Sequence, residues 1–231
     1  MNLYRITPLK TNTYSIPLYL LFLIAGLIQA CQSGKESRTE IYFNNFETAN
    51  LSNISGGKFY SYNQTKMLGN YNKDGFVFYM NQLPAHQMVE VSFDLYIHDS
   101  WDGNQLGNGI DGPDIWALYV DEVPYIYTTF SNNSCFYGPF CPPQSYPGNY
   151  PQNYHNPKTG AYQTGLPPTC NYAHLPYGST IYKIKKTVVH QSGQLTVSCR
   201  DQLIQTNAED PLCDESWSID NLKISLINYE D

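Results

Sequence analysis

The segment from Met88 to His98 constrains the fold more than any other part of the chain, because its apolar and polar residues alternate strictly. The apolar set is Val89, Val91, Phe93, Leu95 and Ile97, with Glu90, Ser92, Asp94 and Tyr96 between them. A period of two predicts a β-strand with one face on a hydrophobic core. No sustained helical period occurs elsewhere, so we expect an all-β fold.

Further short apolar runs follow one another from Glu40 onward, separated by Gly, Asn, Asp and Pro. We expect strands at residues 41–46, 58–62, 75–80, 88–98, 115–120, 124–130, 180–190, 194–199 and 216–227. Twenty-one Tyr, sixteen Gly and fifteen Pro favour strands and ordered loops over helices. About nine strands without an internal repeat predict a two-sheet antiparallel jelly-roll sandwich over residues 40–231.

The segment 131–177 is longer than an ordinary connection between strands. Loops of this length are usually functional or held by disulfides. Cys135 and Cys141 lie in it with Gly138 and Pro139 between them, so the chain can turn back and close a local bridge. We therefore expect one long loop pinned by disulfides.

The remaining cysteines suggest a second bridge. Cys199 ends one expected strand and Cys213 precedes the last one, which predicts that these two pair. Cys170 would then pair with Cys31 or stay free. The six cysteines have no paired C-x-x-C spacing, so they indicate disulfides or buried thiols rather than a zinc site.

The N-terminus has the features of an export signal over residues 1–30. Basic residues precede an apolar run, 16–28, that is too short to span a bilayer comfortably. The run closes on Leu-Ile-Gln-Ala-Cys, which resembles a bacterial lipobox with a lipid on Cys31 and residues 31–39 as a flexible tether. Plain cleavage before Cys31 is the alternative, and lipidation would leave an odd number of cysteines. We expect either a lipid-anchored cell-surface protein or a secreted one, with no other membrane contact.

Charge and motifs exclude several functions. Thirteen Lys and Arg against twenty Asp and Glu give a net charge of −7, which disfavours nucleic acid as a partner. The chain has no G-x-S-x-G or H-E-x-x-H motif. Asp214 and Glu215 beside Trp217 imitate a glycosidase carboxylate pair, but adjacent strand residues point to opposite faces. We expect no enzyme, with a hydrolase acting on glycans as an alternative.

Five ordered motifs carry a resemblance to known domains. They are FDLYIHDSWDGN at 93–104, GPDIW at 112–116, TTFSN at 128–132, QSYP at 144–147 and DESWSIDNL at 214–222. With them the chain resembles a family of exported β-sandwich domains of secreted and lipid-anchored proteins. Its last strand is similar to that of galactose-binding-like and carbohydrate-binding jelly rolls. The resemblance implies the sandwich, and a structural calcium held by an acidic first strand and an Asp-Asn last strand, but no activity.

Two groups of side chains are candidates for calcium. Glu47 follows the first expected strand and Asp220 interrupts the last, and a jelly roll would place these chain ends side by side. The alternative for Asp220 is a turn residue that accepts backbone N–H bonds. The second group is Asp99, Asp102, Asn104 and Asp114. Its spacing does not match an EF-hand, and a Gly-rich loop with Asx turns is the alternative.

The long loop also carries Tyr146, Tyr150 and Tyr154 beside Gln and Asn residues. Aromatic faces with neutral amides suit sugars, because C–H faces stack on rings and hydroxyls bond to amides. A protein-contact surface, or a loop packed on its own sandwich, has the same composition. Trp101, at a strand–loop junction, either stacks on such a ligand or covers the end of the sandwich as core.

These observations predict a non-catalytic exported domain, stabilised by calcium, that displays a Tyr-rich loop toward a glycan or an extracellular protein. A purely structural surface or matrix protein without a small ligand is the alternative.

Overall fold

The computed structural model describes residues 35–106, 111–133, 135, 141–170, 178–206 and 208–230. The predicted export signal and the predicted lipidation site Cys31 lie outside these residues. The chain divides into two compact units, Ser37–Asn228 and the chain ends Met1–Glu36 with Tyr229–Asp231. Within the unit of the chain ends, the Tyr229 hydroxyl donates to the Glu36 carboxylate. The larger unit is a sandwich of two sheets.

Sheet A has seven strands. Its hydrogen-bonded order is β3 (Phe59–Tyr62), β4 (Thr65–Tyr71), β12 (Glu215–Glu230), β6 (Met88–Asp99), β10 (Ser179–Val189) and β9 (Gln163–Leu166), and β1 (Lys35–Asn44) also pairs with β12. Neighbours from β3 to β9 are antiparallel. Two neighbouring strands therefore lie at the centre of the sheet: β12, which is the last strand of the chain, and β6, which has the strict alternation.

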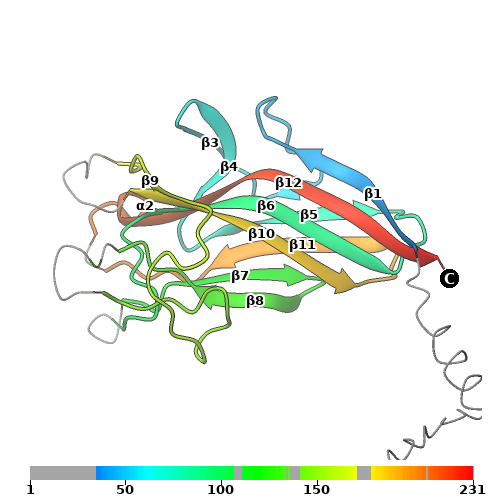
Figure 1. The fold of residues 1–231 in the computed structure, drawn as a ribbon. Coiled ribbons are helices and arrows are strands. Elements are labelled where there is room, and N and C mark those ends of the chain that lie inside the picture. The colour runs from blue at the N-terminus through cyan, green and yellow to red at the C-terminus, as the bar shows by residue number, and fades with distance from the viewer. Residues whose placement is uncertain are drawn as a thin grey trace, which may run out of the picture. The chain divides into compact units, whose positions relative to one another are not determined.

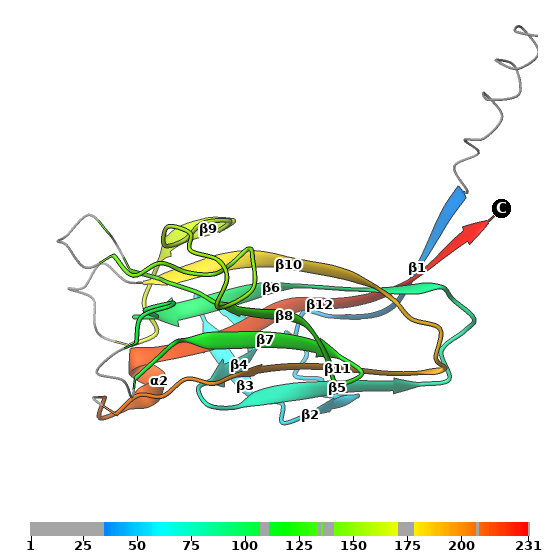
Figure 2. The ribbon, with the colours of Figure 1, turned by 90° about the horizontal axis from the view of Figure 1, so that it is seen from below.

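Sheet B has five strands. Their order is β2 (Ile54–Ser55), β5 (Gly75–Asn81), β11 (Gln194–Asp201), β7 (Ile115–Val120) and β8 (Val123–Thr129). Figure 1 shows the strands along a common direction, and Figure 2 shows the two sheets as stacked layers. The short helix α2 (Pro211–Asp214) leads directly into β12. This arrangement confirms the predicted all-β, two-sheet antiparallel sandwich of the jelly-roll type.

The alternation in β6 has the predicted effect on the core. Val89, Val91, Leu95 and Ile97 are fully buried between the sheets, and the intervening Ser92 and Tyr96 stay partly exposed. One strand face thus removes a continuous row of branched side chains from water, each worth roughly 1.5–3 kcal/mol. The alternation in β6 therefore fixes which face of sheet A packs against sheet B.

The described residues contain twelve strands, more than the nine expected. The additional strands are β2, β4 and β9. Two of them are very short, and β4 contains Gly69 and Asn70, which are poor strand formers that hide its pattern. β1 begins at Lys35, inside the segment 31–39 that we expected as a tether, because β12 offers it backbone partners.

Three tryptophans form the aromatic centre of the core. Trp116 lies edge-on to Trp217, with ring centroids 6.0 Å apart, and the Trp217 indole N–H donates to Asp201 at 2.7 Å. Trp101 is 0% exposed and its indole N–H donates to the Ser216 carbonyl at 3.0 Å. The prediction that Trp101 stacks on a ligand is therefore wrong, because its ring packs in the sandwich interior.

Two disulfides are present among the described residues. The predicted Cys135–Cys141 bridge is one of them, and the other joins Cys170 to Cys213. The predicted Cys199–Cys213 pair is wrong. Cys199 lies on β11 with its side chain in the core, so it remains a buried thiol, and burial raises its pKa. The partner that reaches Cys213 comes instead from the end of the long loop.

Candidate functional site

The long connections gather at one end of the sandwich, near β9 and α2 in Figures 1 and 2. We call this region the loop end and define it as the described residues of 99–114, 129–133, 141–170 and 201–216. It contains most of the predicted site residues.

A buried pair of carboxyl groups lies at its centre. Asp114 and Glu215 are 1% and 3% exposed and hydrogen bond to each other. The backbone N–H groups of Asp102 and Gly103 donate to Asp114, the latter at 2.9 Å, and the Gln205 amide donates to Glu215. Burial raises the pKa of both carboxyls well above the ordinary range. A hydrogen bond between two carboxyls requires one of them to be protonated, so the pair shares a proton.

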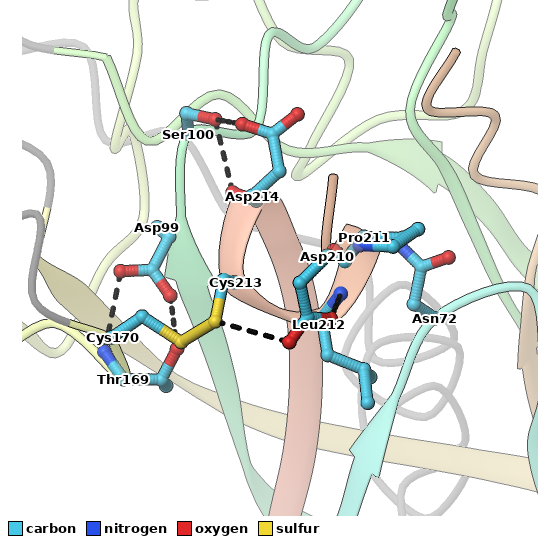
Figure 3. The surroundings of a disulfide bond; sticks show 10 residues. All are labelled: Asn72, Asp99, Ser100, Thr169, Cys170, Asp210, Pro211, Leu212, Cys213 and Asp214. Carbon is cyan, nitrogen blue, oxygen red and sulfur yellow. Dashed lines mark hydrogen bonds between the residues drawn. A yellow bond between two sulfur atoms is a disulfide. The ribbon is translucent and has the colours of Figure 1, made fainter. Parts of the chain in front are cut away.

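Two further acids of the loop end have raised pKa values, and one of them, Asp102, interacts with both members of the pair. Burial raises the pKa of Asp99 and of Asp102 to about 6 each. The Asp99 carboxylate accepts the Thr169 backbone N–H at 3.2 Å and the Thr169 hydroxyl. Figure 3 shows this contact next to the Cys170–Cys213 disulfide, with Ser100 bonded to Asp214 above them. The disulfide and these bonds tie the end of the long loop to β6 and α2.

Asn104 serves a different part of the loop end. Its amide group donates to the Asn153 carbonyl at 2.9 Å, and its oxygen accepts the hydroxyls of Ser145 and Thr129. The Asp102 side chain bonds to Asn133, so the side chains of the four predicted calcium ligands in this segment all have different partners. No group of three or more His, Cys, Asp or Glu side chains in the described residues is placed to hold a metal ion.

The other predicted calcium ligands do come near each other. Glu47 and Asp220 are close enough for their charges to interact, and Asp94 adds to the same field. Burial, with this repulsion, raises the pKa of Asp220 to about 6. The carboxylate of Glu47 accepts the Thr65 hydroxyl and the Lys66 backbone N–H, which lower its pKa. Calcium between the chain ends stays a prediction.

The Tyr-rich loop is held by a buried amide. The Gln144 side chain donates to the carbonyls of Tyr146 and Thr159, each at 3.0 Å. Its oxygen accepts backbone N–H groups from Ser131 and Lys158 at 3.2 and 2.9 Å. The Gln144 side chain thus holds together segments that are distant from one another along the loop.

The predicted tyrosines differ in exposure. Tyr146 packs on Phe130 and Tyr182, with ring centroids 4.9 and 5.2 Å away, so it supports the loop from inside. Tyr150 is half-buried, whereas Tyr154 is 70% exposed. Tyr162, a further tyrosine of the same loop just before β9, is 65% exposed and has the Lys183 ammonium 4.4 Å from its ring centroid.

No protein-family model and no curated protein matches the chain. Among solved structures, it is similar to the CBM22-2 xylan-binding domain from Paenibacillus barcinonensis Xyn10C, with 12% identity, a TM-score of 0.35 and coverage of 80% of this chain and 98% of that one. A family 35 carbohydrate binding module from Clostridium thermocellum has 9% identity and a TM-score of 0.33, covering 81% and 97%.

A third similar structure is dimeric latent PorU from Porphyromonas gingivalis, with 9% identity and a TM-score of 0.40. The match covers 87% of this chain and 13% of the PorU chain. Similarities at this level carry no argument about function. The functional proposal for this chain rests on its own residues. Among the described residues, no helix combines the length and apolar character needed to cross a membrane.

Proposed function

We propose that the chain is a non-catalytic exported binding domain that binds a glycan at the loop end through Tyr154 and Tyr162. The observation that carries this proposal is their exposure, 70% and 65%, on a loop that is otherwise tightly held. Leaving two large aromatic rings in water on a fixed backbone costs hydrophobic stabilisation that burial would provide. A ligand that covers them would recover it.

Preorganisation supports binding rather than passive packing. Gln144 and Asn104 fix the backbone on both sides of Tyr154, through the carbonyls of Thr159 and Asn153. A loop that is already ordered loses little entropy when its ligand binds. Aromatic rings stack on the C–H faces of sugars, and the Asn149, Asn153 and Asn156 side chains supply neutral hydrogen-bonding groups nearby.

The carboxyl geometry does not favour a glycan hydrolase. Retaining and inverting glycosidases hold their two carboxyls about 5–10 Å apart, with the sugar between them. Asp114 and Glu215 instead bond directly to each other and are almost completely buried. They have no room for a substrate between them, so we assign them a structural role.

A glycan array with purified protein tests the proposal. We expect the wild type to bind at least one glycan class. The affinity for that glycan should be at least tenfold weaker in Tyr154→Ala and in Tyr162→Ala. Tyr79→Ala is the matched control, because Tyr79 is an exposed tyrosine on β5 of sheet B, outside the loop end. Binding to no glycan at high protein concentration, or an equal loss of binding in Tyr79→Ala, would remove the glycan proposal and favour a structural surface protein.

A further inference from the structure

Sheet B carries a hollow on the face that points away from sheet A. Its volume is about 330 Å³, and its lining includes Val77, Ser198, Arg200 and Glu122. The neighbouring residues Phe76 and Cys199 are buried in the core. Because side chains alternate along a strand, the lining residues Val77, Ser198 and Arg200 point outward. Figure 2 shows β5 and β11, which form the floor, in the layer opposite sheet A.

The strand register explains why the surface is hollow at Arg200. Arg200 pairs with Gly75 on β5 and with Ala117 on β7, so the side chains on both flanks are absent or small. A Cβ at Gly75 would lie 2.1 Å from the Cys199 carbonyl oxygen, so this position takes only glycine without a shift of the backbone. The space beside Arg200 is therefore built into the sheet.

The guanidinium of Arg200 is held but not neutralised. Its Cζ lies 4.0 Å from the ring centroid of Tyr119, which stacks against it. Within the described residues neither Arg200 nor Lys73, which also lines the hollow, takes part in an ion pair. A planar guanidinium fixed by an aromatic ring presents parallel N–H donors that match a carboxylate.

The ends of the hollow differ in charge. The backbone N–H of Lys73 bonds to Asp201, next to Arg200, so Lys73 and Arg200 lie at one end. Two acids of the lining, Asp74 and Asp201, lie at the same end, but Asp74 forms an ion pair with Lys58, and Asp201 is buried and accepts the Trp217 indole N–H. Glu122 lies in the turn between β7 and β8, two residues after Val120, which pairs with Val197 toward the other end. Arg200 and Lys73 attract a carboxylate to the first end, and the Glu122 carboxylate repels it from the second. The Glu122 carboxylate is an acceptor for a hydroxyl or amide donor of a ligand.

We propose that the hollow beside Arg200 is a second binding site, separate from the loop end, for a small ligand that carries a carboxylate and a neighbouring hydrogen-bond donor. Its volume is near the lower end of the range for ligand pockets, about 300–1,000 Å³, so it takes a single unit rather than a long chain. The carboxylate binds Arg200 and Lys73, and the donor binds Glu122. An acidic sugar and the C-terminus of a peptide share this chemistry.

Titration of the 15N-labelled full domain by NMR tests the proposal, with the amide signals of Gly75, Val77 and Ser198 as readout. Two matched pairs of probes are used: glucuronate with glucose, and N-acetylglycine with N-acetylglycinamide. We expect saturable shifts with one or both carboxylates and at least tenfold weaker binding of their neutral partners. A response to glucuronate alone identifies an acidic sugar as the source, and a response to N-acetylglycine alone identifies a peptide C-terminus.

Variants distinguish binding in the hollow from a general effect of the protein's charge. Arg200→Gln should weaken carboxylate binding at least tenfold, and Arg200→Lys should weaken it less, because it keeps the charge and loses the planar fork. Lys223→Gln removes an equal charge from sheet A and should have no effect. Glycan binding by the loop end should survive Arg200→Gln, so the two proposals fail separately. Equal shifts from charged and neutral probes, no shift at all, or unchanged binding in Arg200→Gln would overturn the site.

Discussion

Asp114 on the approach to β7 and Glu215 at the start of β12 share a hydrogen bond between their carboxyl groups, 101 positions apart in the numbering yet both almost completely buried. The pair joins the residue that precedes β7 of sheet B to the first residue of β12 of sheet A. Because burial raises the pKa of both groups, the folded chain binds protons that the unfolded chain releases.

This relation predicts that stability falls as the pH rises. The ordinary pKa of a carboxyl is about 4, so the stabilisation is complete below that value and is lost as the pH passes through the raised pKa values of the folded state. Asp99, Asp102 and Asp220, with pKa values of about 6, act in the same direction between about pH 4 and 6. We expect the melting temperature to be several degrees higher at about pH 5 than at pH 7.5, measured by calorimetry.

Glu215→Gln tests the assignment to this pair. The amide can still bond to Asp114 but does not ionise, so the fall in melting temperature above about pH 6 should be smaller. Glu209→Gln is the control, because Glu209 is exposed and outside the pair. Identical pH dependence in the wild type and Glu215→Gln would show that the pair does not share a proton.

The Cys170–Cys213 bridge should contribute more stability than the Cys135–Cys141 bridge. The cysteines are 43 positions apart in the first and 6 in the second, and a longer closed loop restricts the unfolded chain more. The double variant Cys170→Ser/Cys213→Ser should lose about 2–4 kcal/mol in the free energy of unfolding. Denaturant titration measures the loss, with Cys135→Ser/Cys141→Ser as the matched comparison.

Peptide mapping without reduction gives an independent check of the pairing. It should find Cys170 linked to Cys213, and Cys199 should react with a thiol reagent only after unfolding, because its side chain is buried. Rapid labelling of Cys199 in the native protein would contradict the burial of its side chain in the core.

The sequence predicted those features that depend on local periodicity. The alternation in β6 identified both the strand and its core face, since a period of two leaves little choice of side. The local Cys135–Cys141 bridge followed from a short turn. Disulfide pairing between distant segments could not be predicted in this way. The sequence does not distinguish Cys199 from Cys170 as the partner of Cys213, and only the packing of β11 shows that Cys199 is the buried thiol.

The partners of the predicted site residues could not be predicted from the sequence for the same reason. The acids of residues 99–114 were recognised as a group, but their partners come from distant segments, such as Glu215 and Thr169. Trp101 could not be assigned from its neighbours, because an amphipathic ring at a strand end suits either the core or a ligand. The carbonyl of Ser216 and the packing of the core decide it.

Calcium should stabilise the protein if Glu47 and Asp220 bind it. Their repulsion, with that of Asp94, is part of what raises the pKa of Asp220, and a cation between them would relieve it. At about a hundredfold excess over its dissociation constant, an ion that binds only the folded state adds about 2.7 kcal/mol. We expect a melting temperature several degrees higher in calcium than in chelator.

Asp220→Asn distinguishes a calcium site from general screening of an acidic protein. In chelator the variant should melt at or above the wild-type temperature, since a neutral side chain removes the repulsion from Glu47 and Asp94. Adding calcium should raise the melting temperature of this variant only slightly. Asp102→Asn tests the second predicted group in the same way. If the wild type and Asp220→Asn respond equally to calcium, Asp220 is only the turn residue that accepts the Asn221 N–H.

Gln144 should control the order of the Tyr-rich loop. Its side chain satisfies the carbonyls of Tyr146 and Thr159 and the N–H groups of Ser131 and Lys158. A buried polar group left without its partner costs about 1–3 kcal/mol, so Gln144→Ala should release the backbone of residues 145–162. Hydrogen exchange measured by mass spectrometry should show faster exchange in that segment, with much smaller changes in β5 and β11.

The same variant links loop order to binding. Tyr154 and Tyr162 keep their chemistry in Gln144→Ala, so any loss of glycan affinity reports the cost of ordering the loop on binding. Gln194→Ala, an exposed glutamine at the start of β11, is the control. We expect weaker glycan binding in Gln144→Ala alone, in proportion to the faster exchange. Faster exchange with unchanged affinity would mean that the exposed tyrosines bind without preorganisation, and slow exchange in Gln144→Ala would mean that Asn104 holds the loop without Gln144.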